Sequence, residues 1–109
     1  MIDWSQVRTL REEVGPEDFD EVVELFLEEV EEVVTRLKSN ADVTTLEEDM
    51  HFLKGSAMNL GFESFSKLCQ DGEVMSANGQ AEALDVGSVL ECYQSSKVAF
   101  LNELPTAFH

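Results

Sequence analysis

One histidine stands out in this sequence because a lysine and a glycine follow it within about one helical turn. His51, Lys54 and Gly55 lie in a segment whose apolar residues recur every three or four positions, as in an amphipathic helix. With Leu53 at the centre of the apolar stripe and about 100° per residue, His51 points about 160° away from the core. Lys54 is the one cation in this segment and could hold an anion there. By geometry alone, His51 is either an ordinary exposed histidine or a functional one.

Two further residues on the same outward face favour the functional interpretation. Gly55 lies in mid-helix, where glycine costs about 1 kcal/mol relative to alanine. A glycine there removes bulk, so that another backbone can come close to His51. Met58 falls on the same face, and an apolar residue beside an exposed histidine indicates docking of a partner.

The sequence lacks the common catalytic motifs. It contains no Gly-rich phosphate loop, HExxH, GxSxG or CxxC. The many carboxylates between residues 12 and 32 could be interpreted as a di-metal bundle site. They occupy positions opposite the apolar stripe, however, which is typical of a solvated face. We therefore expect neither a metal nor another cofactor.

Composition limits the classes of protein to which this chain can belong. Its 109 residues predict a single domain, residues 1–109. The net charge of −16 disfavours nucleic acids and anionic membranes as partners, while 43% apolar residues argue against disorder. No stretch matches a membrane span or a signal peptide. Cys69 and Cys92 fit no metal or disulfide spacing, which favours a reducing, cytoplasmic location.

Periodicity predicts helices throughout the chain and no strand of useful length. Asp3 caps a short helix that Gly15 and Pro16 end, with Pro16 in the first turn of the next helix. A polar break at residues 39–42 precedes a third helix, which begins near residues 42–45 with a Thr44–Glu47 capping box and ends at Gly61. The remaining helices span about 62–77 and 83–104, with Pro105 ending the last and residues 108–109 forming a frayed tail.

These elements predict an all-α fold, an antiparallel four-helix bundle with the short N-terminal helix as a lid. Because one bundle buries its apolar stripes internally, we expect a monomer.

The stretch from His51 to Gly61, HFLKGSAMNLG, resembles the signature of histidine-containing phosphotransfer (HPt) domains of two-component phosphorelays. The pattern in that family is His-x-Leu-Lys-Gly-small-small, followed by an apolar residue and Gly. The chain also resembles these domains in length, in helix order and in the position of the histidine on the second long helix.

The resemblance implies a role for each matching residue. His51 would accept the phosphoryl group, Lys54 would neutralise its oxygens, and Gly55 and Ser56 would give steric access. The family often places Gln or Glu on the next helix, hydrogen-bonded to the inner ring nitrogen, and the matching spacing falls on Glu73. Gln70, one turn earlier, is the second candidate. Docking is expected to use the apolar surface around His51, with Met58 and Phe62.

The function implied by this resemblance is that of a phosphocarrier without autokinase or ATP-binding activity. His51 would receive a phosphoryl group from a receiver-domain aspartate or a kinase and pass it to a response regulator. Receiver domains of response regulators or hybrid kinases are therefore the expected partners. The alternative is an acidic helical adaptor that binds a signalling partner without phosphotransfer. Whether the domain stands alone or belongs to a larger kinase stays open, although its termini favour the former.

Overall fold

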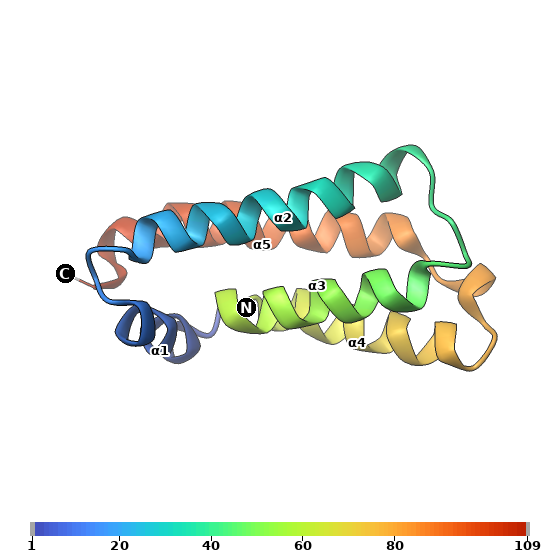
Figure 1. Cartoon of the computed structure of the whole chain (residues 1–109), viewed down its shortest axis with the longest axis horizontal. Helices are drawn as coiled ribbons and strands as arrows, with labels where there is room; N and C mark the ends of the chain where they lie inside the picture. The colour runs from blue at the N-terminus through green and yellow to red at the C-terminus, as the bar shows by residue number, and fades with distance from the viewer. Residues whose placement is uncertain (1, 109) are drawn as a thin grey trace.

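The computed structural model describes residues 2–108, and within that range it contains five α-helices and one short 3₁₀ helix. They are α1 (Trp4–Val14), α2 (Phe19–Ser39), α3 (Leu46–Leu60), α4 (Glu63–Ala77), η1 (Ala81–Ala83) and α5 (Val86–Ala107). Figure 1 shows α2 and α5 side by side in one layer and α3 and α4 in the other, with consecutive long helices antiparallel. The predicted all-α, antiparallel four-helix bundle is confirmed.

The short helix α1 fills one end of the bundle. The helices α2 and α5 have 21 and 22 residues, whereas α3 and α4 have 15 each. At 1.5 Å per residue this difference is about 10 Å, and α1 occupies the space at the end of the α3–α4 pair (Figure 1). The predicted lid is therefore a helix that completes the layer of the two shorter helices.

The junction between α1 and α3 depends on a glycine. Asp3 caps α1 as predicted, because its Oδ1 accepts hydrogen bonds from the backbone N–H groups of Ser5 and Gln6 at 3.1 and 3.3 Å. The backbone N–H of Asp3 donates to the carbonyl of Gly61 at 2.7 Å. Gly61 ends α3 with φ 72°, and a Cβ there would lie 2.5 Å from the Asp3 carbonyl oxygen. Glycine thus permits both the helix stop and the close approach of α1.

The apolar stripe predicted for the third helix is the buried face of α3. Its five members are each at most 1% exposed: Leu46, Met50, Leu53, Ala57 and Leu60. The helix packs most extensively on α4, where Gly72 allows the close approach. A Cβ on Gly72 would lie 3.0 Å from the sulfur of Met50. Burial of this stripe fixes the rotation of α3 and therefore the direction in which His51 points.

An ion pair fixes the start of α3 against the end of α2. Arg36 on α2 donates to both carboxylate oxygens of Asp49, at 3.1 and 2.6 Å, and the Thr45 hydroxyl donates to Asp49 at 3.2 Å. Asp49 is only 7% exposed, and its charge is paired with that of Arg36, whose side chain is 48% exposed at the bundle surface. In the acidic run before His51, the charge of Asp49 is therefore balanced by that of Arg36.

Two helix starts differ from the prediction because turns precede them. Pro16 lies in a turn over residues 16–18 rather than in the first turn of α2, with the Asp18 N–H bonded to the Gly15 carbonyl at 3.1 Å. The last helix begins at Val86 rather than Ala83, because residues 81–83 form the separate helix η1. Asp85 caps α5 by accepting from the backbone N–H of Ser88 at 3.2 Å.

The predicted capping box at the third helix is wrong. The carboxylate of Asp42 accepts from the backbone N–H and the hydroxyl of Thr44, at 2.9 and 2.7 Å. The Thr44 side chain is thus engaged by a residue upstream, as in an Asx turn, and Thr45 precedes the first helical residue without a side-chain cap.

The end of the chain also differs from the prediction. Helix α5 continues through Pro105 to Ala107, and Phe108 is packed rather than frayed. Its ring makes edge contacts with Trp4 and Phe19 at centroid distances of 6.2 and 5.9 Å, and the Arg11 guanidinium lies 4.9 Å from its centroid. These partners belong to the first two helices, so no local pattern could show them. His109 lies outside the described residues.

Replacing Phe108 by alanine is expected to destabilise the fold. The substitution removes the contacts that join α5 to α1 and α2, and we expect a loss of about 1–3 kcal/mol, less than for a fully buried phenylalanine. Urea unfolding followed by circular dichroism measures this free energy, and Phe108→Leu, which keeps an apolar side chain, should lose less. An unchanged urea midpoint for Phe108→Ala would show that the ring adds nothing to stability.

Candidate functional site

The structure places His51 on the open surface of α3, where its ring reaches one residue of the neighbouring α4. Its side chain is 70% exposed, as the helical geometry predicts. The buried stripe of α3 occupies the opposite side of the same helix. An imidazole in this position can be reached by a second protein.

The carboxylate of Glu73 on α4 contacts both His51 and Lys54 of α3. The Nδ1 atom of His51 lies 2.8 Å from Oε2 of Glu73, and the Nζ atom of Lys54 donates to Oε1 of Glu73 at 2.6 Å. The hydrogen bond from Lys54, and then that from His51, lower the pKa of Glu73 below its usual value. Glu73 is therefore ionised at neutral pH and bridges His51 to Lys54.

This bridge determines which ring nitrogen of His51 can react. An ionised carboxylate only accepts hydrogen bonds, so Nδ1 must carry the hydrogen in the His51–Glu73 bond. In the neutral ring the other nitrogen, Nε2, then has a free lone pair. The hydrogen bond also fixes the ring plane. The arrangement therefore presents one nucleophilic nitrogen at the helix surface.

Gly55 leaves open space one turn after His51. A Cβ built on it would meet nothing within 4 Å, so no neighbour in the fold requires glycine at this position. Ser56 differs from the expectation, because it is only 6% exposed and faces the bundle interior. A larger residue at Ser56 would press on the core, so the open surface beside His51 lies above Gly55 and not above Ser56.

The other predicted site residues fall in different places. Met58 is 57% exposed on the outward face of α3. Phe62 is 1% exposed and packs against Phe100 and Tyr93, with centroids 5.4 and 6.3 Å away. The ring of Phe62 is thus directed into the core, although the residue also lines the groove described below, and its part in docking stays a prediction. Gln70 is exposed, and Glu73 rather than Gln70 is the hydrogen-bond partner of His51.

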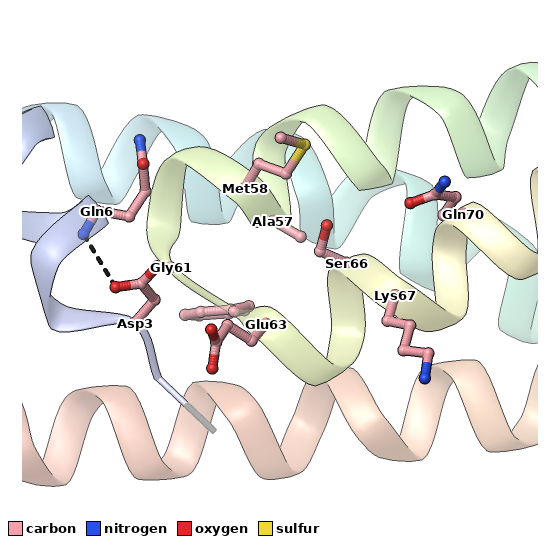
Figure 2. Close-up of a pocket in the computed structure, with 10 residues that line it drawn as sticks. Asp3, Gln6, Ala57, Met58, Gly61, Glu63, Ser66, Lys67 and Gln70 are labelled. Carbon is pink, nitrogen blue, oxygen red and sulfur yellow. Dashed lines mark hydrogen bonds between the residues drawn. The ribbon is translucent and has the colours of Figure 1, made fainter.

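A groove of about 320 Å³ lies beside Met58, between α1, the end of α3 and the first turns of α4. Figure 2 shows Gln6 of α1 across from Met58 of α3, with Ser66, Lys67 and Gln70 of α4 along the other wall. Two helical turns, about 10 Å, separate Met58 from His51 along α3. The contribution of α1 was not predicted, since contacts between residues distant in the chain, such as that of Asp3 with Gly61, bring Gln6 to this surface.

Several polar groups away from this surface have a structural role or are buried. Glu31 of α2 accepts hydrogen bonds from Tyr93, at 2.8 Å, and from Lys97 of α5. Cys69 and Cys92 are both free thiols, and burial raises the pKa of Cys69 to about 12. Within residues 2–108, no group of three or more His, Cys, Asp or Glu side chains is arranged to hold a metal ion.

A comparison with models of known protein families gave a match. The family model described as Hpt domain matches residues 21–105, a range that includes all of α3 and α4 and most of α2 and α5. The chain belongs to the Hpt domain family. Comparisons with curated proteins and with solved structures returned no match.

Membership of the Hpt family assigns the chain a general role. Hpt domains are helical bundles that serve histidine phosphotransfer in two-component phosphorelays. They are phosphocarriers rather than autokinases, and they interact with receiver domains of response regulators and kinases. In the described part of this Hpt domain, no helix is both long and apolar enough to cross a membrane.

Replacing Lys54 by methionine is expected to raise the pKa of Glu73 toward its usual value of 4.5. Because the pKa of Glu73 is lowered in the folded domain, its ionised form stabilises the fold above pH 4.5, and this contribution is lost as pH falls through the lowered pKa. Carboxyl ¹³C NMR of Glu73 during an acid titration measures the shift. Lys67→Met, which removes an equal charge elsewhere on α4, should leave the Glu73 titration unchanged. An identical Glu73 pKa in Lys54→Met and the wild type would contradict the role of Lys54.

Proposed function

We propose that this Hpt domain, a single domain over residues 1–109, carries a phosphoryl group on Nε2 of His51. The observation that supports this most strongly is the 2.8 Å bond between His51 Nδ1 and the ionised Glu73. That bond leaves Nε2 unprotonated in the neutral ring, on a side chain that is 70% exposed. An ordinary surface histidine would have no such partner to orient its ring.

The transfer step needs only the imidazole and a phosphorylated partner. The Nε2 lone pair attacks the phosphorus of an aspartyl phosphate on a receiver domain. A nitrogen–phosphorus bond forms while the phosphorus–oxygen bond to the aspartate breaks, and the aspartate leaves with the electron pair as a carboxylate. The positive charge that develops on the ring is stabilised by Glu73, which holds the Nδ1 hydrogen. The second transfer, to a response regulator, reverses these steps.

Lys54 and Gly55 support the transfer in different ways. The ammonium of Lys54, three residues after His51, neutralises phosphoryl oxygens. The bare surface at Gly55 admits the partner's backbone, because nothing in the fold fills the space above it.

We propose that a receiver domain docks on the surface formed by His51, Gly55 and Met58 and on the adjoining groove. Exposed Met58 supplies apolar contact, and Gln6 and Gln70 supply hydrogen-bonding groups at the groove's walls. The net charge of −16 disfavours nucleic acid and anionic lipid as partners. We also propose that the domain acts as a monomer and in the cytoplasm.

Labelling with phosphorylated receiver domains tests the proposed function. Each receiver of the source organism is labelled with ³²P and mixed with the Hpt domain. We expect at least one receiver to transfer an alkali-stable, acid-labile label. Binding of a receiver without transfer of label would instead identify a helical adaptor and overturn the proposal.

A further inference from the structure

Lys54 is already engaged before any phosphoryl group arrives. Its Nζ atom donates to Glu73 Oε1 at 2.6 Å, while Oε2 of the same carboxylate binds His51. The side chains of Lys54 and Glu73 are 25% and 22% exposed, so this ion pair is partly shielded from water. A phosphoryl group on His51 must therefore compete with Glu73 for the ammonium.

Few other cations can serve a phosphoryl group at this position. With His51 neutral, the charges of His51, Lys54 and Glu73 sum to zero, and a phosphoryl group adds about −1.5 to −2. Lys97 is paired with Glu31 between α2 and α5, and Arg36 is paired with Asp49. Lys67 lies about 120° around α4 from Glu73. Only Lys54 lies on the same helix face within one turn of His51.

We propose that Lys54 exchanges partners when His51 is phosphorylated, leaving Oε1 of Glu73 for the phosphoryl oxygens. Oε2 of Glu73 keeps the Nδ1 hydrogen bond during the exchange. The exchange breaks the Lys54–Glu73 ion pair, so the charge of Glu73 reduces the stability that Lys54 gives to the phosphohistidine. Glu73 is thus a positioning residue that also favours onward transfer. This inference rests on the proposed role of His51 as phosphoryl acceptor.

A titration of the phosphoryl group tests the exchange without a partner protein. The small donor phosphoramidate phosphorylates the imidazole: the Nε2–phosphorus bond forms, the phosphorus–nitrogen bond of the donor breaks, and ammonia leaves with the electron pair. All proteins carry His109→Gln, so that His51 is the one histidine. The pKa of the phosphoryl group is then measured by ³¹P NMR between pH 5.5 and 9, a range chosen around its second ionisation near 6.

Four proteins distinguish the exchange from the loss of a charge alone. All carry His109→Gln, and they have no further change (called the wild-type background below), Lys54→Met, Glu73→Gln, or both of these substitutions. Glu73→Gln keeps an oxygen that accepts from Nδ1 but removes the charge that competes for Lys54. We expect Lys54→Met to raise the phosphoryl pKa by about half a unit in the wild-type background. The rise should be at least twice as large in the Glu73→Gln background. Lys67→Met is the matched control and should leave the phosphoryl pKa within about 0.1 unit.

Two results would overturn the exchange. If Lys54→Met leaves the phosphoryl pKa unchanged in both backgrounds, Lys54 does not bind the phosphoryl group even when no carboxylate competes for it. If the rise is equal in both backgrounds, Glu73 does not compete for the ammonium. Because phosphoramidate replaces the receiver, these outcomes are independent of the labelling experiment. A failure of every receiver to transfer label would refute the proposed function and leave the titration interpretable.

Discussion

His51→Gln is expected to reduce phosphoryl labelling from a competent receiver to background, a loss of at least 100-fold. Glutamine is polar and fits an exposed helix position, but its amide has no lone pair that can replace Nε2 as a nucleophile. Because His51 is 70% exposed, the substitution should change the free energy of unfolding by no more than about 0.5 kcal/mol. Acid-labile ³²P incorporation measures the first effect and urea unfolding the second.

The remaining histidine provides the control for this prediction. His109→Gln should retain full labelling, since nothing in the proposed mechanism uses it. Persistence of an alkali-stable label in His51→Gln would show that another residue accepts the phosphoryl group. That result would remove the basis for the roles assigned to Lys54, Gly55 and Glu73.

Gly55→Gln is expected to block transfer from the receiver by at least tenfold while leaving the fold intact. The new side chain extends into the open space above Gly55, where a Cβ meets nothing within 4 Å. It therefore causes no clash within this domain but occupies the space that the docked receiver needs. Replacing glycine in mid-helix should also raise stability by up to about 1 kcal/mol. Initial rates of label transfer and urea unfolding measure the two effects.

Two comparisons identify bulk as the cause of the block. Gly87→Gln adds the same side chain to an exposed position on α5, which carries no part of the site, and should transfer at the wild-type rate. Phosphoramidate is small, so it should phosphorylate Gly55→Gln as fast as the wild type. A normal transfer rate from the receiver to Gly55→Gln would refute the close-approach argument.

Much of the fold could be predicted because the buried and exposed positions of a helix recur with the helical repeat and so appear as a pattern of apolar and polar residues. The stripe from Leu46 to Leu60 predicted both the third helix and its buried face, and Asp3 and Gly61 correctly marked a start and a stop. Errors occurred at the ends of elements. Asp42 engages Thr44 in a turn, and Phe108 packs on residues from α1 and α2. Such competing contacts leave no periodic signal in the local sequence.

The candidate site was also predicted unevenly. His51, Lys54 and Gly55 lie within five residues, and their relative positions follow from the helical repeat alone. Phe62 differs most from the expectation of an exposed surface residue, because its ring packs in the core. The groove was missed altogether, since its wall from α1 depends on contacts between residues distant in the chain.

The sequence by itself determined which side of the third helix carries the histidine, because a 3.6-residue repeat relates every side chain on one helix to the buried stripe. It could not determine how far α4 slides or rotates against α3. That register is set by core packing, including the approach that Gly72 allows at Met50. Only the tertiary structure therefore decided that Glu73, and not Gln70, reaches His51, and that the same carboxylate also binds Lys54.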